Sequence, residues 1–149
     1  MLKLLTDLKA LYYTYLIWKT LPTSYEEKAE NAKKIFNTKI KNRERSNMFA
    51  HYCPLCEFVS QQVGGTPYKW QVDMTAAKCS KCLLRDLWQG KDYYTAPCEK
   101  DFKSPYSKWR KCCQSMKCSY DAQFFALLIA EEAYAKYLKL KKEKDIQRT

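Results

Sequence analysis

The sequence predicts a small, mainly α-helical protein, and three observations lead to this fold class. Apolar residues recur three or four positions apart near both ends of the chain, which is the spacing of one helix face. Only three glycines occur in 149 residues, two of them adjacent at Gly64 and Gly65, so tight hairpin turns are scarce. Apolar residues form 46% of the chain and aromatic residues 15%, enough for a packed core. We expect one domain over residues 1–149, with N-terminal helices in 1–50, a cysteine-rich region in 51–103 and C-terminal helices in 104–149.

Two helices are expected in the N-terminal region. The first has an apolar face formed by Leu4, Leu8, Leu11, Tyr15 and Trp18, and Pro22 closes it. The second begins with a capping box of Ser24 and Glu27. Its core-facing residues are expected to be Tyr25, Ala29, Ala32, Phe36 and Ile40. Its other face is expected to lie in solvent and carries Lys28, Lys33, Lys34, Lys39, Lys41, Arg43 and Arg45.

Two further helices are expected after the cysteine-rich region. Ser104 is a candidate cap with Pro105 at the first helical position, and Tyr106, Trp109 and Cys113 would share a face. Ser119 can cap a last helix of roughly 25 residues. The start of that helix is apolar all round, which predicts burial of Phe124, Phe125, Leu127, Leu128 and Ile129. Beyond Tyr137 the helix becomes basic and is expected to be exposed. A short strand is the one exception to the helical pattern, at residues 68–72.

The eight cysteines are the strongest chemical signal. Two Cys-x-x-Cys pairs, Cys53 with Cys56 and Cys79 with Cys82, are separated by residues 57–78. Each short pair directs two thiolates toward one ion, so four such ligands suit tetrahedral zinc. We expect zinc to stabilise the centre of the domain.

The ligand set remains open among several alternatives. A competing set replaces Cys79 with Cys98, and His51, the only histidine, lies two residues from Cys53. Cys112 and Cys113 diverge too far within a helix for both to bind one ion easily, and Cys118 follows them. Disulfides or buried thiols are the alternatives to a metal.

The cysteine pattern resembles a group of uncharacterised small cysteine-rich bacteriophage proteins. The resemblance covers about residues 50–135 and continues through Cys98 to Ser104-Pro105-Tyr106-Ser107-Lys108-Trp109. The chain departs from the group at Leu83, where proline is frequent, and in the longer gap between the pairs. The resemblance implies a zinc-bound viral accessory protein that binds and blocks a host nucleic-acid-handling or defence complex, as an anti-CRISPR-like inhibitor does.

A second resemblance points to a different class. The segment from Cys53 to Val59 is similar to the opening of a saposin-like domain, a helical lipid-binding fold with three disulfides, and Cys113 and Cys118 have roughly its closing spacing. Eight cysteines instead of six and an additional N-terminal helix depart from that pattern.

Catalysis is not expected from this sequence. One histidine leaves little scope for an acid–base pair, and there is no glycine-rich phosphate loop or zinc-hydrolase motif. The N-terminus lacks the features of a secretory signal, and no apolar run has membrane-spanning length. We therefore expect a cytoplasmic protein, in the host cell if viral, with reduced thiols and no membrane partner.

The formal net charge of +11 predicts an anionic partner. Cations and aromatic residues alternate around Tyr106 and Trp109, a mixture that suits phosphates and bases, although packing would explain the aromatics equally well. Candidate contacts to nucleic acid or a partner are Lys103, Lys108, Arg110, Lys111, Lys139, Lys141 and Lys142. Expected partners are a host protein or nucleoprotein complex, or nucleic acid bound directly with little sequence preference.

Overall fold

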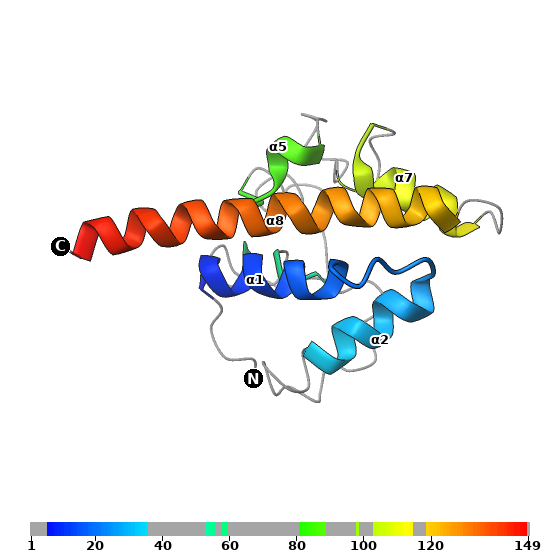
Figure 1. Ribbon diagram of the computed structural model, residues 1–149, viewed down its shortest axis with the longest axis horizontal. Helices are drawn as coiled ribbons and strands as arrows, with labels where there is room; N and C mark the ends of the chain where they lie inside the picture. The colour runs from blue at the N-terminus through cyan, green and yellow to red at the C-terminus, as the bar shows by residue number, and fades with distance from the viewer. Residues whose placement is uncertain are drawn as a thin grey trace.

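A computed structural model of the chain describes residues 6–35, 53–55, 58–59, 81–88, 98, 103–114 and 119–148. Over these residues the protein is mainly helical and has no strand, which confirms the predicted fold class. The elements are α1 (Asp7–Trp18), α2 (Tyr25–Ile35), α5 (Arg85–Trp88), α7 (Pro105–Gln114) and α8 (Ser119–Arg148). Figure 1 shows α8 crossing the whole molecule, with α1 beside it. The strand expected at residues 68–72 lies outside the described residues.

Helix α1 is capped at both ends by local bonds. The Thr6 hydroxyl accepts a hydrogen bond from the Lys9 N–H at 3.1 Å, an N-cap. After Trp18 the chain turns sharply at Leu21, whose φ of 55° is left-handed and whose N–H donates to the Trp18 carbonyl at 3.0 Å. The helix therefore ends before Pro22, as that proline predicts.

The capping box of α2 forms, with one change. The Glu27 N–H donates to Ser24 Oγ at 3.1 Å, as predicted. The Glu27 carboxylate accepts its return bond from the Thr23 N–H at 3.1 Å, one residue earlier than a capping box requires. The start of α2 is therefore fixed by its own local sequence.

The burial expected for the residues of α2 was only partly correct. The assignment of Lys28 to a solvated face was wrong, because Lys28 is only 4% exposed. Lys33 and Lys34 are exposed as expected, and Ala32 is buried. Tyr25 and Ala29, expected to face the core, are half-buried. Seven further residues of these two N-terminal faces lie outside the described residues: Leu4, Phe36, Lys39, Ile40, Lys41, Arg43 and Arg45.

Helices α1 and α8 pack side by side and run in opposite directions (Figure 1). An ion pair of 2.6 Å joins Asp7 at the start of α1 to Lys144 near the end of α8. The face of α8 in the core consists largely of small residues that let a neighbouring backbone approach closely: Ala122, Ala126, Ala130 and Ala133, with Ile129 among them. Bulky partners come from α1 and include Leu11, Ile17 and Trp18.

Helix α7 packs on α8 as well and contributes Trp109, which has no solvent exposure. Pro105 is the first residue of α7, as predicted, and the carbonyl of Ser104 before it accepts from the Lys108 N–H at 3.0 Å. The hydroxyl of Ser104 donates to the Cys98 carbonyl at 2.7 Å. This side chain therefore connects the start of α7 to the cysteine-rich region.

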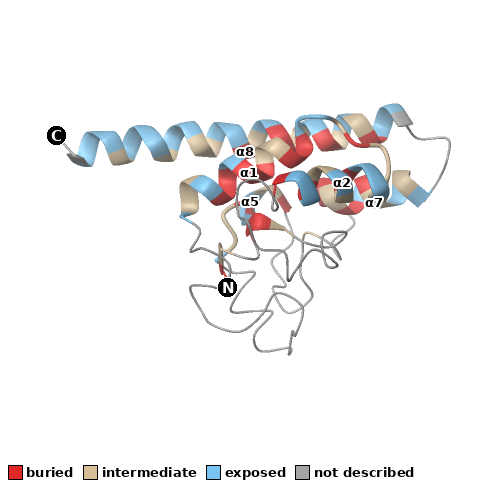
Figure 2. Cartoon of the chain, turned by 90° about the horizontal axis from the view of Figure 1, so that it is seen from below, coloured by how far each residue is buried: buried red, intermediate tan, exposed pale blue. Residues whose placement is uncertain are grey.

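The predicted burial of the start of α8 was wrong for two of its largest residues. Ile129 is buried, but Phe124 is 55% exposed and Leu127 is 39% exposed. The helix is also longer than predicted, at 30 residues from Ser119. Figure 2 shows that buried positions on α8 cluster where α1 lies against it, and that most of its length toward the C-terminus is exposed. Neighbouring helices cover one face of α8, and an apolar residue on another face stays in solvent.

Candidate functional site

The structure places one cysteine from each predicted zinc-binding pair against the same hydrophobic core. Cys53 and Cys82 are both half-buried and pack against the same core. Burial is the largest cause that raises the pKa of the Cys82 thiol, to about 11, and negative charge on nearby Cys53 acts in the same direction.

Cys82 also accepts a hydrogen bond that would suit a metal-bound thiolate. The indole Nε1–H of Trp88 donates to Cys82 Sγ at 3.5 Å and lowers its pKa, opposing the effect of burial. Lys136 of α8 lowers the pKa as well and fixes the segment, donating to the Leu83 carbonyl at 3.1 Å. Donors around a ligating sulfur orient it and stabilise its negative charge.

The third described candidate ligand, Cys98, packs against this same core and is joined to α7 through Ser104. Cys56, Cys79 and His51 lie outside the described residues. Over the described part of the chain, no group of three or more histidine, cysteine, aspartate or glutamate side chains is placed to hold a metal ion. The described residues therefore supply part of the donor chemistry that zinc requires, and the ligand set stays a prediction.

Cys112 and Cys113 are half-buried on α7. Burial is the main cause that raises the pKa of Cys113 to about 11, followed by negative charge on Cys112 and on Glu27 of α2. A thiol in this environment stays protonated and unreactive at neutral pH. Cys118 lies outside the described residues.

The basic cluster on α7 divides into an outer and an inner set. Lys103, Lys108 and Lys111 are exposed, as a binding role requires. Trp109 is completely buried, and its Nε1–H donates to the Pro22 carbonyl at 2.8 Å. The packing explanation therefore holds for Trp109, which has no free face for a base.

Arg110, the remaining predicted contact on α7, is half-buried and held against aromatic side chains. Its Nε donates to the Tyr25 hydroxyl at 3.4 Å, and its guanidinium lies 5.9 Å from the Tyr106 ring centroid. These contacts give Arg110 a packing role that the sequence pattern does not distinguish from partner binding.

Lys28 occupies an aromatic enclosure that the sequence analysis missed. Its Nζ lies 5.6 Å from the Trp18 ring centroid and 5.1 Å from the Tyr106 ring centroid. It also donates to the Tyr106 hydroxyl at 3.4 Å. Three rings pack edge-on nearby, with Trp18 4.9 Å and Tyr25 5.5 Å from Trp109. No sequence motif marks Lys28, and its contacts with rings from α1 and α7 explain its burial.

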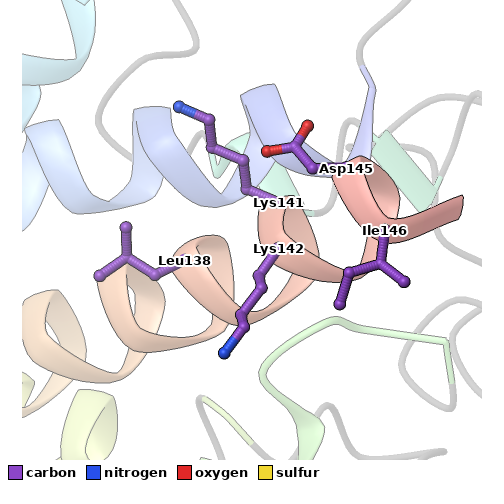
Figure 3. Close-up of a pocket in the computed structure, with 5 residues that line it drawn as sticks. All are labelled: Leu138, Lys141, Lys142, Asp145 and Ile146. Carbon is purple, nitrogen blue, oxygen red and sulfur yellow. The ribbon is translucent and has the colours of Figure 1, made fainter. Parts of the chain in front are cut away.

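The predicted basic residues at the end of α8 are all exposed: Lys139, Lys141 and Lys142. Figure 3 shows Lys141 and Lys142 on the wall of a shallow hollow that is also lined by Leu138, Asp145 and Ile146. Lys141 Nζ additionally lies 5.9 Å from the Tyr137 ring centroid. Apolar and cationic side chains therefore alternate on this surface, which suits an anionic partner that also offers apolar contacts.

No protein-family model, curated protein or solved structure matches this chain. Among the described residues, no helix is both long enough and apolar enough to cross a membrane.

Proposed function

We propose that the protein acts by binding and not by catalysis, as a zinc-stabilised viral accessory protein that docks on a host protein or nucleoprotein complex and blocks it. The observation that carries the proposal is the basic end of α8, where Lys139, Lys141 and Lys142 are all exposed. Figure 1 shows this end of α8 extending past the other helices, so a partner can reach it from several sides.

Charge and shape both favour an acidic protein surface or a nucleic-acid channel as the docking site. The chain carries a formal net charge of +11, which attracts anionic surfaces and speeds encounter with them. Leu138 and Ile146 are 47% and 63% exposed beside the lysines and can supply apolar contacts. Lysine provides diffuse attraction better than bidentate base recognition, which favours a partner selected by shape and charge.

Zinc would support this surface from the cysteine-rich region. Cys53 and Cys82 belong to both predicted ligand sets, which Cys56 completes together with either Cys79 or Cys98. A closed thiolate site supplies folding free energy and no reaction chemistry. Native mass spectrometry of protein purified without added metal should find one zinc per chain and reduced thiols. A metal-free chain whose mass is lowered by disulfide formation would contradict the zinc assignment and favour the saposin-like alternative.

The docking proposal is tested by charge reversal with a matched control. The variant changes Lys139, Lys141 and Lys142 to Glu, and the control changes three exposed lysines elsewhere, Lys9, Lys33 and Lys34, to Glu. Both variants alter the net charge equally. We expect the first to weaken a reconstituted complex with a purified host partner about tenfold or more, and the control to have a much smaller effect.

Nuclease treatment and oligonucleotide binding separate the two kinds of partner. A complex that survives nuclease supports protein docking. Binding to DNA or RNA oligonucleotides alone, with an affinity that falls steeply as salt rises, would instead support direct nucleic-acid binding. Equal loss of binding in the variant and the control would show that net charge matters but the end of α8 does not.

A further inference from the structure

A regular stripe of exposed residues runs along α8. Its members alternate four and three positions apart, which is the spacing of a coiled-coil seam. Every member is exposed, and we call the set the α8 stripe: Tyr120, Phe124, Leu127, Glu131, Tyr134, Leu138, Lys141 and Asp145. At a rise of 1.5 Å per residue the stripe is about 38 Å long.

Five of the eight members of the α8 stripe are aromatic or aliphatic residues. Tyr120 is 87% exposed, Phe124 55% and Leu138 47%. Most core-facing positions of α8 are different ones, including Ala122, Ala126, Ile129 and Ala133, and of the stripe the Tyr134 ring lies 4.6 Å from the Tyr15 ring of α1. Exposed apolar residues that recur along one face of a helix are characteristic of an interaction site.

The charges on α8 identify the partner that fits this stripe. From Ser119 to Ala133 the helix has three acidic residues, Asp121, Glu131 and Glu132, and no lysine or arginine. From Tyr134 to Arg148 it is strongly basic, with Lys136, Lys139, Lys141, Lys142, Lys144 and Arg148 against Glu143 and Asp145. Two α8 helices that pair in opposite directions place acidic halves beside basic halves, whereas parallel pairing places like charges together.

One antiparallel register pairs every member of the stripe with a compatible residue. With the two-fold axis between residues 132 and 133, Leu127 faces Leu138 of the second copy, and Phe124 faces Lys141. Tyr120 then faces Asp145, and Glu131 faces Tyr134. These are an apolar pair, a ring with an ammonium group, and two hydroxyl–carboxylate pairs. Each pair occurs twice, as a two-fold axis requires.

In this register the hollow in Figure 3 lies opposite a side chain of the second copy, where coiled-coil packing places a hole. Its lining includes Leu138, Lys141, Lys142 and Asp145, which stand at the four spacings that surround an inserted side chain in a coiled coil. Ile146 extends one wall. In the register above, Phe124 of the second copy is the side chain opposite this hollow.

We infer that two copies of this chain pair antiparallel along the α8 stripe, with Phe124 of each copy seated in the hollow lined by Leu138, Lys141, Lys142 and Asp145 of the other. Asp121 lies near Lys142 of the second copy at the edge of the same interface. This inference goes beyond the proposed function and does not depend on zinc. The dimer would cover Leu138, Lys141 and Lys142 of the proposed docking surface, so pairing and host docking would compete for this end of α8.

The first experiment measures the mass of the full chain in solution over a concentration series by sedimentation equilibrium. We expect twice the chain mass of 17.7 kDa at high concentration. Phe124→Glu should abolish the dimer, while Gln147→Glu, which adds the same charge at an exposed position away from the stripe, should retain it. A native chain that stays monomeric throughout would overturn the inference, as would a Phe124→Glu chain that remains folded by circular dichroism and dimeric.

The second experiment tests direction and register. Benzoylphenylalanine at position 124, in a mixture of ¹⁴N-labelled and ¹⁵N-labelled chains, should crosslink between copies to residues 138–145. A crosslink to residues 120–128 would indicate parallel pairing and overturn the register. Asp121→Lys and Lys142→Asp should each weaken the dimer roughly three- to thirty-fold, and the double variant should restore it. If the double variant does not recover dimer affinity, Asp121 and Lys142 do not face each other across the interface, which would contradict the register.

Discussion

Helices α7 and α8 both combine aromatic residues with lysines, yet they present them in opposite ways. On α7, Trp109 is completely buried while Lys108 and Lys111 are exposed. On α8, Phe124 is 55% exposed, and the buried face consists mostly of alanines. The difference shows that the apolar character of a large side chain does not by itself cause it to be buried. The alanines let α1 approach α8 closely, and Phe124 and Leu127 lie on another face, whereas the Tyr134 and Tyr137 rings of α8 contact the tyrosine rings of α1.

The largest expected effect comes from truncating the buried ring on α7. Trp109→Ala should lower the free energy of unfolding by about 3–5 kcal/mol, because it leaves a cavity and removes the bond to the Pro22 carbonyl. Phe124→Ala on α8 should change it by about 0.5 kcal/mol or less. Urea unfolding at low protein concentration, where self-association does not contribute, measures both. Similar losses of unfolding free energy in the two variants would show that Trp109 and Phe124 contribute equally to stability, contrary to their difference in burial.

We expect Cys113, which is half-buried on α7, to be protected from alkylation. Because the pKa of Cys113 is raised from 9.0 to about 11, its thiolate population below pH 9 is about one hundred-fold smaller than that of an ordinary thiol. Iodoacetamide labelling followed by peptide mass spectrometry, at pH 8 and in denaturant, should show slow reaction in the folded chain and fast reaction after unfolding. Equal rates at pH 8 would contradict the buried environment.

The same comparison can be made between two lysines of α2. Lys28→Ala should lower the free energy of unfolding by about 1–3 kcal/mol, because it removes ring contacts and leaves a buried space. Lys34→Ala, at an exposed position on the same helix, should change it by less than about 0.5 kcal/mol. Thermal unfolding monitored by circular dichroism distinguishes them, and a neutral Lys28→Ala would show that the enclosure contributes little.

The smallest effect is expected at the ion pair between Asp7 and Lys144. Both side chains are partly exposed, so the pair should contribute about 0.2–1 kcal/mol. A double-mutant cycle with Asp7→Ala and Lys144→Ala measures the coupling. The coupling free energy should shrink as salt is added, because salt screens exposed charges. A salt-independent value would contradict the partial exposure of the pair.

Local signals in the sequence were sufficient for the starts of two helices, whereas the short helix α5 was not predicted. The box of Ser24 and Glu27 and the proline at position 105 predicted the starts of α2 and α7, because caps and fixed backbone angles act within a few residues. Burial was predicted less well. Lys28 was assigned to solvent and Phe124 to the core, and both assignments were wrong.

The candidate site was predicted in outline only. The Cys-x-x-Cys pairs predicted a shared centre, and of these cysteines the structure describes Cys53 and Cys82, which both pack against the core, so the zinc site stays a prediction. The lysines at the end of α8 are exposed as predicted, whereas Trp109 packs inward. The spacing of the α8 stripe was present in the sequence, but the same spacing describes a buried face equally well.

The sequence by itself determined that this chain forms helices, where two of them begin, and that it carries a strong positive charge. These properties depend on residues close together along the chain and on composition. Only the tertiary structure decided which side of each helix faces the core, because that depends on neighbours distant in sequence. The rings of α1 and α7 bury Lys28, and the alanine face of α8 receives α1 and leaves Phe124 and Leu127 in solvent.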